Sequence, residues 1–369
     1  MIFSSTYLSN RYVELSLIPS RDNLKHIRLN AKQLRIYRVC LNESVEAPFQ
    51  YFDPTLEVTQ RDGDNDKKDL ETFSENHVSG CNLTDPDLNG GELNIKVPSE
   101  AFQQGLIAEG KVLKVSVEFS LEDPKGGVHF VVPEGAEGMT MAERAAHMFT
   151  FGHENSARLW FPCIDTTSEP CTWKLEFTVD ESMTAVSCGE LLETVYTPDM
   201  KRKTFHYYVS SPTAAPNIAL VVGPFQVYVD PNMHEVTHFC LPHLLPVLKN
   251  TVRQLYEVFE YFETILATQF PFTCYKQVFV DQLSEDICHY STLTLFNTKI
   301  LHSSAVIDQT YETRKLLARG LAAQFFGCYV STEKWSDRWI KKGIQLYLMG
   351  LWVKKTFGNN EYRDLIHQH

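Results

Sequence analysis

The spacing of apolar residues changes once along this chain of 369 residues, between about residues 225 and 243. Before the change, short stretches alternate apolar and polar side chains, which is the period of a half-buried β-strand. Turn-forming residues separate them, as in Pro-Lys-Gly-Gly at 124–127. Because no helical pattern intervenes, we expect antiparallel sheets packed face to face. The clearest alternating stretches are residues 11–20, 111–120, 127–133, 172–179 and 205–211.

After the change, apolar residues recur at helical spacing. Residues 244–271 are expected to form one long helix, and residues 275–281 return to a strand pattern. The next helix is expected over 310–327, with Thr310 as its N-cap and Gly327 as its stop. The chain closes on a helical stretch that is interrupted at Gly-Asn-Asn. The pattern therefore predicts a mixed α and β protein with a β-rich domain over 1–225 and an α/β domain over 226–369.

Composition predicts a packed globular protein, since 43% of the residues are hydrophobic and 12% are aromatic. The formal net charge of −12 opposes a protein-wide electrostatic hold on nucleic acid, although a local basic face is compatible with it. Part of the acidity lies in residues 60–76, which we expect to form a solvated loop. No run of about 18 apolar residues predicts a membrane span, and no secretory leader is recognisable.

The nine cysteines are scattered singly, without a CxxC pair and with an odd total. In a chain of this size, that pattern predicts free, mostly buried thiols and a reducing, intracellular compartment. Composition does not separate the nucleus from the cytosol.

Several phrases stand in an order that resembles the zinc aminopeptidases of the gluzincin group. They include "RLWFPCIDTTSEPCTWKLEFTV" (158–179), "GPFQ" (223–226), "YSTLTLFNTKIL" (290–301), "AQFFG" (323–327) and "WSDRW" (335–339). The resemblance implies an N-terminal, antiparallel, saddle-like β domain followed by a thermolysin-like α/β domain. It begins partway into the first domain and stops within the second, so we expect a fragment of a longer protein.

The resemblance also locates a degenerate zinc site. The HExxH motif of the family falls on "RGLAA", which places Arg319 and Ala323 at the two His positions and Gly320 at the general base. The third ligand, a Glu in the family, corresponds to Lys342, and the Glu of the exopeptidase motif corresponds to Cys288. Arg and Lys carry positive charge, and Ala and Gly have no ligand atom. We therefore expect no enzyme activity, no cofactor, and no catalytic, metal-binding or cofactor-binding residue.

Further phrases narrow the resemblance to the aminopeptidase-like TBP-associated factors, subunits of the general transcription factor TFIID. They include "IRLNAKQLRIYRV" (27–39), "DPKGGVHFVVP" (123–133), "EVTHFCLP" (235–242) and "KKTFGNNEYR" (354–363). The resemblance implies a nuclear, non-catalytic scaffold that helps TFIID engage core-promoter DNA for RNA polymerase II initiation. The implied partners are other TBP-associated factors, TBP and core-promoter DNA, with no membrane and no small-molecule substrate.

Two other functions stay open at this stage. The vacated cleft could bind peptides of partner proteins, or the chain could be an active metalloaminopeptidase with unusual ligands. Only the fold motivates the second, and a fold does not carry a function by itself.

Some single side chains also have two interpretations. Arg319, Lys341 and Lys342 could form an anion site, or they could pair with Glu312, Glu333 or Asp337 or point to water. The basic clusters 201–203 and 354–355 could contact phosphate, but a solvated surface is the simpler interpretation. A Cys288–His289 hydrolase is disfavoured because neighbouring strand residues face opposite ways. The other histidines weighed as metal ligands, for which the spacing supports no site, are His302, His367 and His369.

Overall fold

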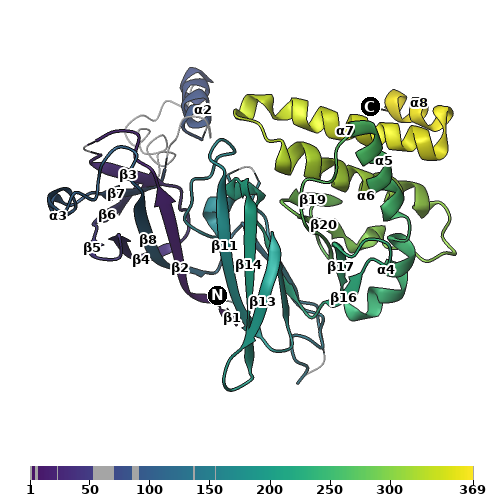
Figure 1. Ribbon diagram of the computed structural model, residues 1–369, viewed down its shortest axis with the longest axis horizontal. Coiled ribbons are helices and arrows are strands. Elements are labelled where there is room, and N and C mark those ends of the chain that lie inside the picture. The colour runs from purple at the N-terminus through teal and green to yellow at the C-terminus, as the bar shows by residue number, and fades with distance from the viewer. Residues whose placement is uncertain are drawn as a thin grey trace. The chain divides into compact units, whose positions relative to one another are not determined.

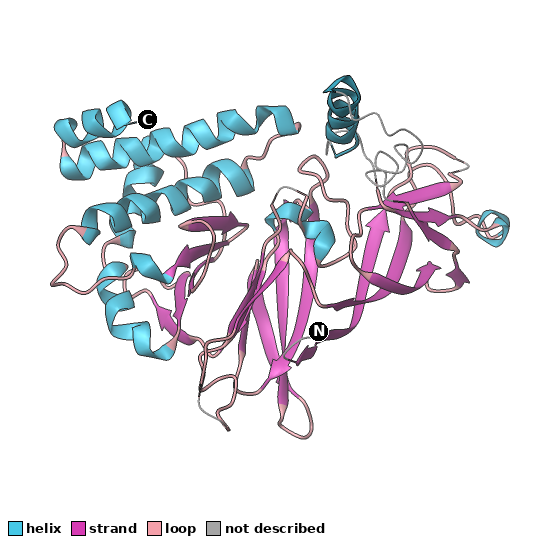
Figure 2. Ribbon diagram, turned by 180° about the vertical axis from the view of Figure 1, so that it is seen from behind, coloured by secondary structure: helices cyan, strands magenta, loops and turns pink. Residues whose placement is uncertain are grey.

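The computed structural model describes residues 2–4, 7–22, 24–52, 70–84, 91–135, 138–153 and 155–368. The chain forms two compact units. Unit 1 contains residues 1–128 and 151–166, and unit 2 contains residues 129–150 and 167–369. Strands dominate the early part of the chain and helices the late part (Figures 1 and 2), which confirms the predicted mixed α and β class. These units divide the chain differently from the boundary expected near residue 225, which stays a prediction.

Unit 1 is built on antiparallel strands. One run follows the order β1-β2-β8-β4-β5, and a smaller sheet follows the order β3-β7-β6. Strand β8 alternates buried and exposed residues only in part, because it lies between β2 and β4. The elements are β1 (Ile2–Ser4), β2 (Tyr7–Leu17), β3 (His26–Leu29), β4 (Arg35–Leu41), β5 (Val45–Glu46), β6 (Phe49–Tyr51), α2 (Leu70–Thr84), β7 (Leu93–Lys96), α3 (Ser99–Gln103), β8 (Leu113–Glu122) and the 3-10 turn η2 (Ala157–Leu159).

The β part of unit 2 has two runs of strands. One follows the order β13-β14-β11, and the other is a four-stranded sheet in the order β12-β15-β10-β9. The pairs β11–β14, β13–β14, β12–β15 and β10–β15 are all antiparallel. The strands are β9 (Val128–Val131), β10 (His147–Thr150), β11 (Cys171–Asp180), β12 (Thr184–Ser187), β13 (Glu190–Tyr196), β14 (Arg202–Thr213) and β15 (Leu220–Gly223).

The rest of unit 2 is a five-stranded mixed sheet with helices beside it (Figure 1). Its order is β16-β17-β18-β20-β19, and β17, β18 and β20 are parallel. The strands are β16 (Gln226–Val229), β17 (Val236–Cys240), β18 (Tyr275–Val280), β19 (Ile287–Tyr290) and β20 (Leu293–Asn297). The helices are α4 (Leu245–Thr251), α5 (Leu255–Leu266), α6 (Gln309–Ala323), α7 (Arg338–Phe357) and α8 (Asn359–Gln368), with short turns at η3 (Ala215–Asn217), η4 (Pro242–Leu244), η5 (Thr298–Ile300), η6 (Gln324–Tyr329) and η7 (Trp335–Asp337).

Two predicted helices differ from those in the structure, and each difference has a physical cause. The expected single helix over 244–271 is wrong, because the chain turns between α4 and α5. Val252 caps α4 yet packs into the same core as both helices, so the apolar period continues across the break. Helix α6 begins at Gln309, with Asp308 rather than Thr310 as the flanking residue. It ends at Ala323 in a wide π-helical turn that contains Gly327, so the predicted stop lies four residues too late.

The structure also bears on the predictions for residues 60–76, for the cysteines and for membrane-spanning helices. The acidic loop over 60–76 is wrong for residues 70–76, which lie in α2, while residues 60–69 lie outside the described residues. All nine cysteines are free and six are buried, as their scattered spacing predicted. Across the described stretches, no helix has the length and apolar character that a membrane crossing requires.

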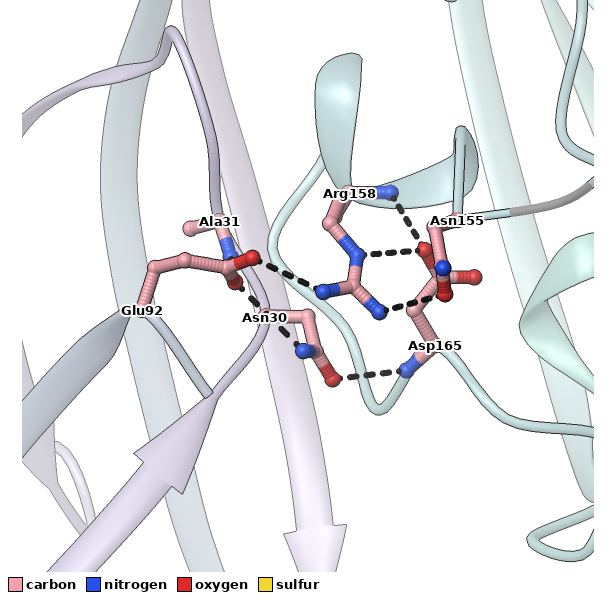
Figure 3. A network of polar contacts seen from close by, with 6 residues as sticks. All are labelled: Asn30, Ala31, Glu92, Asn155, Arg158 and Asp165. Atoms are coloured by element: carbon pink, nitrogen blue, oxygen red, sulfur yellow. Dashed lines mark hydrogen bonds and ion pairs between the residues drawn. The ribbon is translucent and has the colours of Figure 1, made fainter. Parts of the chain in front are cut away.

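Arg158 organises the polar interior of unit 1 (Figure 3). Its guanidinium donates to Glu92 Oε1 at 2.8 Å, Asp165 Oδ2 at 2.8 Å and Asn155 Oδ1 at 3.0 Å. Burial acts to lower the pKa of Arg158, but the carboxylates of Asp165 and Glu92 outweigh burial and raise it. Because Glu92 also accepts the backbone N–H of Ala31, one side chain ties the 155–165 segment to the strands of this unit.

We predict that Arg158→Ala lowers the free energy of unfolding by about 3–5 kcal/mol, because it leaves two buried carboxylates without their cation. Chemical denaturation of the protein measures the change. Arg38→Ala is the matched control, since the Arg38–Glu46 pair is exposed and its loss costs about 0–1 kcal/mol. Equal losses in the two variants would contradict this account.

Candidate functional site

The positions at which the family places its zinc ligands lie on two helices of unit 2. Arg319, Gly320 and Ala323 are on α6, and Lys342 is on α7, which packs beside α6. Arg319 is half-buried, Gly320 and Ala323 are buried, and Lys342 is exposed. The predicted helix therefore carries the three degenerate positions as expected.

Gly320 lies against the sheet rather than in an open site. A Cβ atom at this position would be 2.9 Å from Phe296 Cζ, 3.1 Å from Ile287 Cδ1 and 3.4 Å from Thr294 Cγ2. Phe296 is fully buried and stacks on Phe279 with ring centroids 5.4 Å apart, so it has no room to withdraw. A methyl group here would require Phe296 or the helix to shift, and a Glu would have to be buried in an apolar contact.

The side chains at the ligand positions do not fit a divalent metal. Arg319 and Lys342 are cations without a lone pair to donate, and Ala323 has no donor atom. Within the described ranges, no group of three or more His, Cys, Asp or Glu side chains has the arrangement of a metal site. The side chains at these four positions therefore offer no donor set for a divalent ion.

Gln324 holds the end of α6 to the sheet, a role that the sequence pattern did not reveal. Its side chain is fully buried. Its Nε2 donates to Tyr290 O at 2.9 Å and Thr294 Oγ1 at 3.1 Å, and its Oε1 accepts from Thr292 N at 2.9 Å. An isolated Gln within an otherwise apolar run, Leu321 to Phe326, is the signal that could have identified it, since a polar side chain in a core needs partners.

A buried polar chain extends from this anchor across the sheet. Tyr275 donates to Thr294 Oγ1 at 2.9 Å, and Gln277 Nε2 donates to the Tyr275 hydroxyl at 3.4 Å. His238 Nδ1 lies 3.0 Å from Gln277 Oε1, and its Nε2 lies 3.4 Å from Asp230 Oδ2. These contacts satisfy polar groups inside β17, β18 and β20, which makes the network a structural support rather than an exposed reactive group.

Cys288, at the exopeptidase position, is buried on β19. Burial raises the pKa of its thiol to about 12; the carboxylate of Glu285 acts in the same direction, and the Arg319 guanidinium offsets part of the shift. Arg319 therefore lies within electrostatic range of the degenerate exopeptidase segment. His289, the next residue, is partly buried, and its side chain points to the opposite face of the strand from that of Cys288.

The basic side chains near the site do not pair as proposed with Glu312, Glu333 or Asp337. Among the described residues, none of the ion pairs joins these carboxylates to Arg319, Lys341 or Lys342, and Glu312 pairs with Lys315 at 2.8 Å. Lys341 Nζ donates instead to the carbonyl of Gly327 at 3.5 Å. Burial lowers the pKa of Lys341, and the nearby charges of Arg338 and Lys342 lower it further.

The other residues considered in the sequence, the two basic clusters and three of the histidines, lie on separate elements. Lys203 lies over the ring of Phe205, and Lys354 lies over the ring of Tyr362, so each basic cluster has one member engaged with an aromatic ring. His302 is buried; its backbone N–H donates to Thr251 Oγ1 at the end of α4, and its ring Nδ1 lies 3.1 Å from the carbonyl oxygen of Ser303. His367 lies in the last turn of α8, and His369 lies outside the described residues.

Comparison with known proteins shows what this chain is similar to. Residues 251–369 match the model of the peptidase family M1 domain. The chain is 56% identical over 95% of its length to transcription initiation factor TFIID subunit 2 of Drosophila melanogaster, and 54% identical over 97% to that of Gallus gallus. It covers 28% and 30% of those proteins. Aminopeptidase N of Streptomyces lividans is 24% identical over 70% of the chain, which is 30% of that enzyme.

We predict that Gly320→Ala destabilises the protein by about 1–2 kcal/mol, because overpacking against Phe296 outweighs the gain in helix propensity. Gly343→Ala on α7 is the matched control: nothing lies within 4 Å of the position that its Cβ would occupy. That variant should gain about 0.5–1 kcal/mol. Thermal or chemical melts measure both, and a stabilised Gly320→Ala protein would show that the helix does not contact the sheet here.

The state of Cys288 can be tested by alkylation. With a pKa near 12, about one Cys288 thiol in ten thousand is ionised at pH 8, and the thiolate is the reactive form. We predict that iodoacetamide modifies the exposed Cys81 in the native protein while Cys288 reacts only after unfolding. Peptide mass spectrometry reads both sites, and rapid native modification of Cys288 would restore it as a candidate nucleophile.

Proposed function

We propose that this chain, which carries a peptidase family M1 domain and matches TFIID subunit 2 proteins over nearly its whole length, is part of a non-catalytic TFIID subunit. In this role it scaffolds the complex in the nucleus and helps it engage core-promoter DNA for initiation by RNA polymerase II. Its partners would be other TFIID subunits, including TBP, and promoter DNA. The whole-protein role is a proposal because the chain spans less than a third of those relatives.

The observation that carries the proposal is the closed base position on α6. A zinc peptidase needs a metal to lower the pKa of water and a carboxylate to take its proton. Here the base position is a glycine in contact with a buried phenyl ring, and the ligand positions hold Arg319, Ala323 and Lys342. The identity to TFIID subunit 2 proteins, more than twice the identity to the aminopeptidase, points in the same direction.

The intact packing around the lost site supports a scaffold role. Helix α6 packs beside β19, and its Leu321 and Ala322 lie in the same buried core as Ile287 of β19 and Phe296 of β20. A structure that keeps its core while losing its ligand chemistry retains surfaces on which partners can assemble. Function then resides in those surfaces rather than in a reaction.

The proposal predicts that affinity-tagged protein, purified from nuclear extract, brings down other TFIID subunits together with TBP. Elemental analysis of the purified protein should find far less than one zinc per chain, and aminoacyl-anilide turnover should be at background with or without chelator. An active M1 aminopeptidase, measured in parallel, is the positive control. Stoichiometric zinc held by residues around 319–342, or recovery without any TFIID subunit, would overturn the corresponding half of the proposal.

A further inference from the structure

Strand β13 forms an edge with no neighbour on one side. It ends the run β13-β14-β11, and in the described stretches of the chain no strand pairs with its outer side. All seven of its residues are exposed. Strands at an edge are normally short or protected by Lys or Pro, because their free backbone N–H and C=O groups can pair with another chain. Residues 190–196 contain neither Lys nor Pro.

The exposed side chains of β13 are unusually apolar. Leu191, Leu192, Val195 and Tyr196 are 47%, 61%, 46% and 47% exposed. Leu191 pairs with the buried Tyr207 of β14, so it continues the buried face of this sheet out to the rim. The β13–β14 register shifts between Leu191 and Glu193, which leaves Leu192 as the extra residue of a bulge. An added strand would therefore find apolar contacts beside the open backbone.

Both ends of β13 are held in place. Before it, Gly189 has φ of +79°, and a Cβ there would lie 2.2 Å from Tyr208 O, so only glycine fits. Gly189 N donates to Thr292 Oγ1 at 2.7 Å. After the strand, Thr197 donates from N to Arg202 O at 2.9 Å and from its hydroxyl to Asp199 at 2.5 Å. Because β13 is already ordered, binding a partner there would cost little conformational entropy in this strand.

The negative charge of β13 favours a basic partner. Glu190 and Glu193 are exposed on β13, and no ion pair involves either of them within the described residues. A second copy of this chain, pairing antiparallel about the centre of the strand, would place Glu193 opposite Glu193, which is unfavourable. A strand with Lys or Arg at those positions would instead gain cross-strand attraction.

We propose that β13 is a docking site for an extended, basic segment of another polypeptide, which adds to the sheet as an antiparallel neighbour. The main-chain hydrogen bonds of such β-strand addition supply affinity, and the alternating side chains supply specificity. Lysine or arginine on the added strand faces Glu190 and Glu193, and apolar residues cover Leu191 and Tyr196. The site does not depend on the lost zinc ligands.

Hydrogen exchange tests the site with two probes: a nine-residue peptide in which Lys alternates with Val, and the same peptide with Glu in place of Lys. The Lys peptide should slow exchange of the 190–196 amides at least about tenfold, while the Glu peptide should leave them unchanged. Protection by neither peptide, or equal protection by both, would overturn the proposal. So would a protein that sediments as a dimer with these amides already protected, because the second copy would then be the occupant.

Two charge-reversal variants separate the edge from general electrostatics. Glu193→Lys should weaken binding of the Lys peptide about two- to fivefold and allow the Glu peptide to bind. Glu260→Lys changes the same net charge at an exposed position of α5 and should leave both affinities as they are. Equal effects of the two variants would mean that the peptide responds to overall charge rather than to β13.

Discussion

The close approach of α6 to the sheet at Gly320 is the contact on which the interpretation of this protein depends. A glycine is needed there because Phe296, Ile287 and Thr294 already fill the space that a side chain would take. Apolar burial of this kind is the main stabilising term in a folded domain. By the resemblance to zinc aminopeptidases, Gly320 also stands where those enzymes keep their general base. Our proposal of a non-catalytic role therefore rests on the packing at this residue.

A second principle is that polar groups inside the molecule are matched with partners. Gln324 ties the end of α6 to the turn between β19 and β20, and Arg158 ties two acidic side chains together in unit 1. Removing either partner of such a pair costs the full desolvation of the other. These anchors hold the end of α6 against the sheet of unit 2 and the 155–165 segment against the strands of unit 1.

The function that we propose for this chain depends on its surface. Strand β13, all of whose residues are exposed, lies at a sheet edge and is distant in sequence from positions 319–342. Residues 251–369 match the peptidase family M1 domain and the chain is similar to TFIID subunit 2 proteins, so an assembly role is the function that we propose for it. A rigid edge such as β13 is the type of feature through which an inactive fold can join a complex.

The sequence alone predicted the strands of the early part and the helical character of the late part, since periodicity is a local property. The expected loss of zinc ligands rests on residue chemistry and stays a prediction. It misplaced the turn at Val252, because a buried residue in a break keeps the apolar period, and it did not reveal Gln324 as an anchor. Only the tertiary structure showed that Gly320 is closed by Phe296 and that β13 has an open side. Both depend on which distant residues meet, and no local pattern encodes that.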